Sequence, residues 1–383
     1  MKTYIKLTSA VAAASFLLGV QSYGFVEIAR GSLTAGLSAR AEYDTNIFGN
    51  NTSDADTIFS FTPDLRYTRA VGKISTIAVA GVNIIRFNEA DDENSEDPFA
   101  SVTFNYDAAD KGNARLSIGF ARSSQADDTV LDRLKSDEYA LDSMVNHFYS
   151  EKLGYRVGFG TTISESKTNG FNDVDTYTVS LGSVYRYSQK LNAALTYSFR
   201  KSGTEDVDTT LFEKPDSDDH RLTASLEGEI SPKVTGQIGV GFSIRDYDEG
   251  GSDVAPTLST GLNWAAAEKT TVSFNATQDF ETTSAAQSAL RFKTSLGVTQ
   301  AINAKLNLTG SFGYEHATYE NSAVAPADNG RTDDSFIFQA GAAYAFTRYV
   351  SANAGITYRD NQSDAARADY ERTIVSVGVS ARY

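Results

Sequence analysis

Residues 33–44 read Leu-Thr-Ala-Gly-Leu-Ser-Ala-Arg-Ala-Glu-Tyr-Asp. The odd-numbered positions are apolar or aromatic, and the even-numbered positions are small, polar or charged. Successive side chains of a β-strand point to opposite faces, so this period of two predicts a strand with one apolar face. The same pattern recurs along the chain, for example at 155–160, 222–226 and 306–314, and no convincing helical pattern follows residue 24.

The breaks between these segments fall into two classes. Eight short breaks lie near residues 71–73, 107–113, 150–152, 188–190, 231–233, 265–269, 301–304 and 347–348. Nine longer, acidic breaks lie at 44–57, 88–97, 125–137, 165–175, 201–219, 246–253, 281–288, 320–334 and 360–369. Strict alternation of short turns and long loops is typical of outer-membrane barrels. We therefore expect an all-β fold, a transmembrane antiparallel up-and-down β-barrel of 18 strands.

Two alternatives remain open. Residues 74–87 can be read on either face, residues 139–147 alternate poorly, and Pro63 would remove a donor from a ladder, so 16 strands is the alternative count. A soluble β-sandwich would also alternate, because one face of each sheet is wet. Its loops need not sort by length, however, and 18 apolar faces would be hard to bury in one sandwich. A closed barrel turns those faces to lipid.

The N-terminus has the pattern of a secretory signal peptide. Lys2 and Lys6 give a positive start, and an almost wholly apolar run of 14 residues follows at 7–20. A membrane-spanning helix needs about 20 apolar residues, so this run is too short to be one. We expect a signal peptide at residues 1–24 and an outer-membrane β-barrel at residues 25–383, located in the cell outer membrane.

Composition excludes several classes of protein. The chain has no cysteine, which rules out disulfides and thiolate metal sites, and its three histidines lie far apart. It carries 49 acidic and 34 basic residues, a net charge of −15, whereas a nucleic-acid binder needs basic surface. We expect no metal, no cofactor and no nucleic-acid partner.

Aromatic residues gather at both ends of the expected strands. Outward positions near the short turns are Tyr67, Tyr106, Tyr155, Tyr185, Tyr187, Trp264, Tyr344 and Tyr383. Those near the long loops are Tyr43, Phe59, Phe120, Tyr177, Phe199, Phe280, Phe292, Phe336 and Tyr358. Amphipathic rings at both ends would form the two interfacial girdles of a membrane barrel.

The last strand carries a further feature. Val375, Val377 and Val379 alternate with small or polar residues, and the chain ends on Tyr383. This resembles the C-terminal signal of outer-membrane proteins that the barrel assembly machinery reads, although most such signals end in Phe. Expected partners are therefore this machinery, outer-membrane lipid and lipopolysaccharide.

Residues 43–48, Tyr-Asp-Thr-Asn-Ile-Phe, close the first expected strand. On a chain of this length and rhythm, the segment resembles the family often called putative β-barrel porin 2. The resemblance implies an outer-membrane barrel with no assigned enzymatic role, in a family with some links to exopolysaccharide production. Locally, we expect Asp44 and Asn46 to cap a turn through Asx hydrogen bonds rather than to bind a ligand.

Barrels of this size enclose an aqueous lumen, and the predicted lumen face is rich in basic residues. Near the loops these residues are Arg40, Arg200, Arg221, Arg245, Arg291, Lys293, Arg359 and Arg372; near the turns they are Arg66, Arg115, Arg156, Arg186 and Arg382. Opposing acids are Glu42, Asp64, Glu227, Glu229 and Glu315. This bias predicts a porin-like channel for passive passage of small hydrophilic solutes, with anion preference as a narrower hypothesis.

Barrel closure would make the strands of Arg359, Arg372 and Arg40 neighbours, which predicts a local anion site. Pairing of these cations with acids on loops or adjacent strands remains the alternative.

The sequence also bears on three other functions. His316 lies beside Glu315, and His220 follows two aspartates, but no nucleophile–base pair is evident, so we expect no enzyme. An exopolysaccharide-associated export barrel stays an alternative. So does a structural or adhesive barrel with acidic loops, because residues 88–97 hold six carboxylates that could attract divalent cations. The simpler interpretation is a solvated acidic rim, loosely bridged to lipopolysaccharide.

Overall fold

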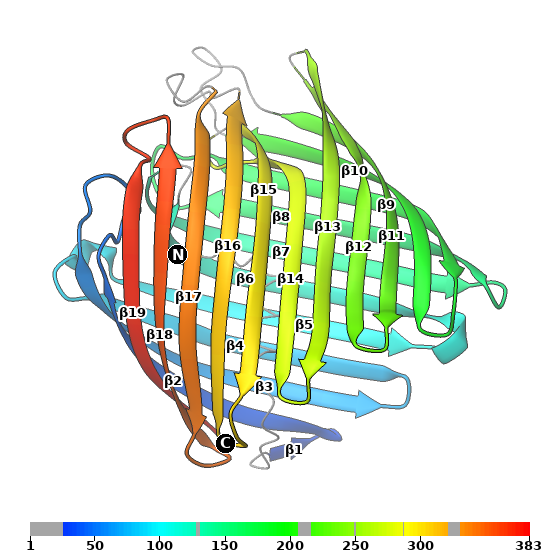
Figure 1. Ribbon diagram of the computed structural model, residues 1–383, viewed down its shortest axis with the longest axis horizontal. Coiled ribbons are helices and arrows are strands. Elements are labelled where there is room, and N and C mark those ends of the chain that lie inside the picture. The colour runs from blue at the N-terminus through cyan, green and yellow to red at the C-terminus, as the bar shows by residue number, and fades with distance from the viewer. Residues whose placement is uncertain (1–25, 128–130, 206–215, 249, 286, 321–329) are drawn as a thin grey trace.

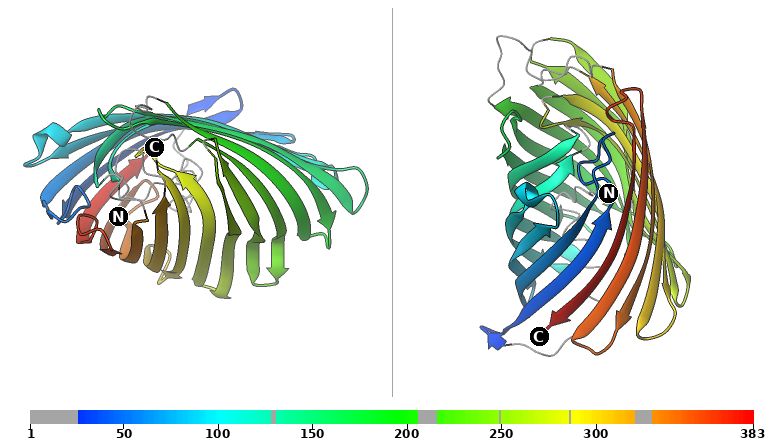
Figure 2. Two further views of the ribbon diagram at one scale, coloured as in Figure 1. Left: turned by 90° about the horizontal axis from the view of Figure 1, so that it is seen from above. Right: turned by 90° about the vertical axis from the view of Figure 1, so that its left-hand side faces the viewer.

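The computed structural model describes residues 26–127, 131–205, 216–248, 250–285, 287–320 and 330–383. Long antiparallel strands form one closed barrel, with each strand paired to the next and the last paired to the first (Figures 1 and 2). The barrel has 18 strands, β2 to β19, which confirms the predicted fold and count. The alternative of 16 strands is wrong. The expected signal peptide at residues 1–24 lies outside the described residues.

The strands are contiguous and similar in length. A short strand β1 (Val26–Ile28) pairs with β2 before the barrel begins. The barrel strands are β2 (Gly31–Asp44), β3 (Asp56–Val71), β4 (Ile74–Phe87), β5 (Ser95–Asp107), β6 (Gly112–Asp127), β7 (Asp132–Phe148), β8 (Leu153–Ser166), β9 (Asp173–Arg186), β10 (Leu191–Glu205), β11 (Ser217–Ser231), β12 (Val234–Tyr247), β13 (Ser252–Ala267), β14 (Thr270–Thr282), β15 (Ser288–Ala301), β16 (Leu306–Glu320), β17 (Thr332–Ala345), β18 (Val350–Ser363) and β19 (Tyr370–Arg382).

Helical structure is minor. The described residues contain two short 3₁₀ turns, η1 (Asp91–Glu93) and η2 (Ala109–Lys111). Within the described ranges, no helix combines the length and apolarity needed to cross a membrane.

The two faces of the wall follow the predicted alternation. Leu195, Ala224 and Val240 lie opposite one another on β10, β11 and β12, and Leu195 is 50% exposed on the outer face. Residues 74–87 were ambiguous because both of their faces are apolar. Pairing of Ala78 with outward-facing Tyr67 assigns their even-numbered positions to the outer face. Exposed apolar rows of this kind are stable against lipid tails rather than water.

One predicted girdle residue is misplaced. Phe280 is only 5% exposed and packs inside the barrel, with the guanidinium of Arg245 5.0 Å from its ring centroid. The prediction that it faces lipid is wrong, because the end of β14 leaves the wall.

Several long breaks are shorter than predicted. In particular, β6 continues to Asp127 and β7 begins at Asp132, so most of the predicted break at 125–137 is paired strand. A strand that projects beyond the membrane needs no apolar face, so its acidic and hydroxyl side chains look like a loop in the sequence.

Two hairpins separate from the wall at their loop ends. The ladder between β13 and β14 stops at Leu258 and Gln278, although β13 stays paired with β12 as far as Ser252. The ladder between β5 and β6 stops at Phe99 and Ala121. Figure 1 shows β14 diverging from β13 at this end.

A proline lies close to each stop. Pro98 comes directly before Phe99, and Pro256 lies two residues before Leu258. Because proline has no backbone N–H, it cannot donate to the neighbouring strand and so limits how far a ladder extends.

The outer face also holds a groove of about 720 Å³, across the seam where β19 meets β2. Outward alanines line it, including Ala39, Ala41, Ala352 and Ala354. This groove lies on the outer, lipid-facing side of the wall, so it is not part of a path through the lumen.

Candidate functional site

All 13 basic residues predicted for the lumen lie on inward-facing positions of their strands. Arg221, Arg245 and Arg291 show the rule, because each alternates along its strand with outward apolar residues and pairs with an inward residue on the next strand. The structure therefore places these 13 side chains on the inner face of the wall.

Most of these cations have carboxylate partners. The ion pairs are Arg40–Glu42, Arg156–Glu227, Arg200–Asp219, Arg200–Asp279, Arg221–Asp279, Arg245–Asp219, Arg291–Glu281, Arg359–Glu315, Arg372–Asp44 and Arg382–Asp64. Four of the 13, Lys293, Arg66, Arg115 and Arg186, have no ion pair with a carboxylate among the described residues.

The sequence count of lumen acids was too low. Four more acids face inward from the ends of their strands, where the sequence is as acidic as the adjoining loops. They are Asp44, Asp219, Asp279 and Glu281. They neutralise much of the basic charge at the loop end. The alternative of cross-strand pairing thus describes that half of the barrel.

The three seam arginines lie on adjacent strands as predicted, but each is already bound. Arg372 donates from Nε to Asp44 at 2.9 Å, and Arg40 contacts Glu42 at 2.9 Å. Arg359 donates to Ser335 at 2.8 Å and to Glu315 at 3.3 Å. The seam therefore contains three neutralised guanidinium groups rather than three free ones.

The segment that carries the family resemblance has two structural roles. The backbone N–H of Asn46 donates to Asp44 Oδ1 at 3.0 Å, and Asn46 Oδ1 accepts from the N–H of Gly49 at 3.0 Å, as expected for Asx turns. The turn points Ile47 into the barrel mouth, where it packs against Ile58 and Phe87. The bond from Asp44 to Arg372 was missed, because it joins the first strand to the last.

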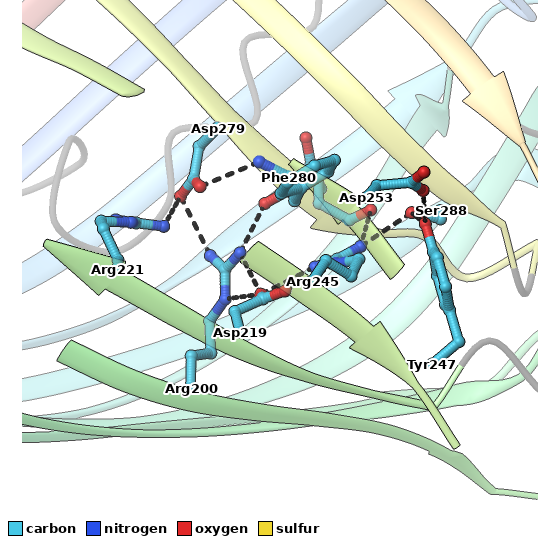
Figure 3. Close-up of polar contacts among 10 residues, drawn as sticks. Arg200, Asp219, Arg221, Arg245, Tyr247, Asp253, Asp279, Phe280 and Ser288 are labelled. Atoms are coloured by element: carbon cyan, nitrogen blue, oxygen red, sulfur yellow. Dashed lines mark hydrogen bonds and ion pairs between the residues drawn. The ribbon is translucent and has the colours of Figure 1, made fainter. Parts of the chain in front are cut away.

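A second network lies on the inner faces of β10, β11 and β12 (Figure 3). Arg245 binds Asp219 with two parallel hydrogen bonds of 2.7 and 2.9 Å, and both side chains are buried. Arg200 donates to Asp219 at 2.6 Å and reaches Asp279 at 3.0 Å. Arg221 also binds Asp279. These bonds join three wall strands to β14, which has folded inward to meet them.

The inward-folded β14–β15 hairpin is fastened by further hydrogen bonds. Arg245 donates to Ser288 Oγ at 2.9 Å and to the carbonyl of Glu281 at 3.2 Å. The hydroxyl of Tyr247 lies 3.0 Å from Ser288 Oγ, and Arg200 donates to the carbonyl of Phe280 at 2.8 Å. Charged donors on the wall therefore hold both arms of this hairpin.

The loop end of the β6–β7 hairpin contacts β4, η1 and β5. Arg133 donates to Glu93 at 2.8 Å and to the carbonyl of Ser124 at 2.7 Å, and its guanidinium lies 4.5 Å from the centroid of Phe87. Ser124 Oγ donates to Asp97 at 2.8 Å. The loop end of the barrel is thus packed with buried polar side chains from several strands.

Comparison with known proteins identifies the family. The family described as "Putative beta-barrel porin 2" matches residues 30–383.

The chain belongs to this family.

Solved structures share the fold of this porin-family barrel. OpdK of Pseudomonas aeruginosa, crystallised with vanillate, aligns with a TM-score of 0.51 and 12% identity, covering 94% of this chain and 100% of OpdK. OccK2 (OpdF) of the same organism aligns with a TM-score of 0.50 and 10% identity, covering 94% and 99%. No curated protein matches the chain.

The turn end of this porin-family barrel is organised differently from the loop end. Arg156 on β8 reaches across two strands to bind Glu227 on β11 with bonds of 2.7 and 2.6 Å. Arg186 donates to the carbonyls of Glu151 and Asp110. Arg115 is exposed to the lumen. Solvated basic groups therefore remain at this end, whereas seven of the eight basic residues predicted near the loops are ion-paired, Lys293 being the exception among the described residues.

The histidines of this porin-family barrel lie on its outer face. His220 Nδ1 lies 2.7 Å from the hydroxyl of Tyr197, and His316 Nδ1 lies 2.8 Å from Asp334. Neither contact supplies a nucleophile for a base to activate. Within the described ranges, no group of three or more His, Asp or Glu residues is placed to hold a metal ion.

Proposed function

We propose that this barrel is a porin-like channel for passive passage of small hydrophilic solutes across the outer membrane. The observation that carries the proposal is the division of its faces, with apolar side chains outside and charged or hydroxyl side chains inside a closed 18-strand wall. Barrels of 16 to 18 strands have room for an aqueous lumen, unlike small barrels that side chains fill. Membership of the porin family supports the same function.

We further propose that the channel prefers anions, and that the turn end sets this preference. Ion selectivity depends on fixed charges close to the path, and unpaired cations act more strongly than neutralised ones. Arg66 and Arg115 face the lumen there without an ion-paired carboxylate among the described residues. The paired cluster of Arg40, Arg359 and Arg372 contributes less, which moves the expected anion site away from the seam.

Reversal potentials in a KCl gradient test this preference. The wild-type channel in a planar bilayer should select chloride over potassium, and Arg66→Ser/Arg115→Ser should shift the reversal potential toward zero. The matched control is Arg69→Ser/Lys111→Ser, which removes the same charge from an outward position and a turn. Cation preference in the wild type, or equal shifts in both variants, would contradict the proposal.

No contact among the described residues favours exopolysaccharide export or adhesion over solute passage. Because buried polar side chains pack the loop end, a small solute fits this barrel better than a polysaccharide does.

A further inference from the structure

We propose that the inward-folded arms of the β14–β15 hairpin, residues 279–282 and 288–291, form the constriction of this channel. Pro256 is the residue that releases them from the wall, and Arg221 and Asp279 are the side chains that a passing solute meets. The inference deepens the proposed function and rests on it.

Strand register locates the point of release. If the β13–β14 ladder continued beyond Leu258 and Gln278, Thr257 would face Asp279 and Pro256 would face Phe280. Pro256 has no N–H to donate to β14, so that pair cannot complete its hydrogen bonds. The carbonyl of Pro256 instead accepts from the side-chain amide of Gln278 at 2.9 Å. This side-chain bond ends the ladder where backbone bonds would otherwise extend it.

The bend reverses the environment of β14. Phe274 faces lipid as its even-numbered position predicts, but Phe280, on the same parity, is buried inside the barrel. The preceding strand β13 stays straight and paired with β12. The change therefore belongs to β14 and β15, which move together because their own ladder continues to Thr282 and Ser288.

The ion pairs that hold these arms form two layers, one buried and one facing the lumen. Arg245 and Asp219 have side-chain exposures of 0% and 1%, so they anchor the hairpin to the wall without contacting solutes. Arg221 and Asp279 are 27% and 33% exposed and form the layer that faces the lumen. A solute passing the hairpin meets this lumen-facing pair, Arg221 and Asp279.

The lumen-facing pair also suggests a class of solute. The carboxylate of Asp279 lies between the guanidinium groups of Arg200 and Arg221 and forms an ion pair with each. The Nε of Arg221 is buried and has no hydrogen-bond partner among the described residues. Guanidinium groups bind carboxylates through parallel hydrogen bonds, so a small carboxylate solute can compete with Asp279 here. We therefore assign small carboxylates as the solutes that this constriction recognises.

The hinge is tested by Pro256→Thr. Threonine restores the N–H and suits a strand, so the arms should return to the wall and single-channel conductance should rise by about twofold or more. Pro63→Thr is the matched control, because the β3–β4 ladder resumes on both sides of Pro63. Unchanged conductance for Pro256→Thr, in protein that remains heat-modifiable on gels, would overturn the proposal.

A measurement independent of conductance separates the hinge from the channel function. Val254 and Thr282 would be opposite each other only in a completed ladder, and the chain has no native cysteine. Val254→Cys/Thr282→Cys should form a disulfide in the Pro256→Thr background and not with Pro256 present. A disulfide formed equally in both backgrounds would refute the hinge, whether or not the protein conducts ions.

The solute-facing pair has its own test. Asp279→Asn should shift the reversal potential toward anions, and Arg221→Gln should shift it the opposite way. Asp248→Asn, at an exposed loop carboxylate, is the control for Asp279. Equal shifts for Asp279→Asn and Asp248→Asn would show that the pair does not lie on the solute path.

Discussion

Asp44→Ala should lower the free energy of unfolding by about 3–5 kcal/mol, because it leaves the Arg372 guanidinium buried without its carboxylate. Asp44 is 0% exposed and Arg372 is 3% exposed, so water cannot replace the lost partner. The same substitution removes the acceptor for the Asn46 N–H. Asp44 thus holds both the seam and the first loop.

The control is Asp54→Ala, in the same loop but exposed, which should change stability little. Asp44→Asn should fall between the two, because it keeps an acceptor for Asn46 while losing the charge. Unfolding in detergent, followed by loss of heat-modifiability against urea concentration, measures all three. Equal midpoints for Asp44→Ala and Asp54→Ala would exclude a seam-closing role.

Leu195→Arg should impair assembly, with a cost of roughly 2–4 kcal/mol for a cation facing the middle of the bilayer. Leu195 lies in an exposed apolar row with Ala224 and Val240, away from the interfaces where Arg could reach water. The folded fraction in membranes, measured by heat-modifiability, should fall.

Thr196→Arg is the matched control, since the adjacent side chain faces the lumen beside Thr223 and Gly182. It should assemble normally, because its guanidinium can stay hydrated. Equal folding of the two variants would contradict the face assignment of β10.

The sequence predicted the strands of the barrel and their faces better than the side-chain contacts at the loop end. A period of two fixes which residues share a face, and break lengths fix the strand count, so the barrel and its inward cations follow from local patterns. Residues 74–87 are the exception, because both faces carry apolar side chains and only pairing with β3 decides between them.

The partners of the inward cations could not be predicted, because they depend on register between strands. Arg156 and Glu227 are separated by 71 residues and two intervening strands, and nothing local marks them as a pair. Asp219 and Asp279 were hidden because acids at strand ends resemble loop residues. Pro256 is visible in the sequence, but its effect appears only when the position of the ladder stop is known.

The seam has a further consequence for how the chain could be rearranged. Ala35 and Tyr383 exchange two backbone hydrogen bonds of 2.7 and 2.8 Å, so the end of the chain lies against the start of the first barrel strand. A linker joining these ends, with new termini opened between the exposed residues Gly250 and Gly251, would give a circular permutant with every ladder intact. In that permutant Val375, Val377 and Val379 would still pair within the wall, but they would no longer precede a chain end. Circular permutation would thus separate the mechanical contribution of β19 from the terminal signal that its sequence predicts.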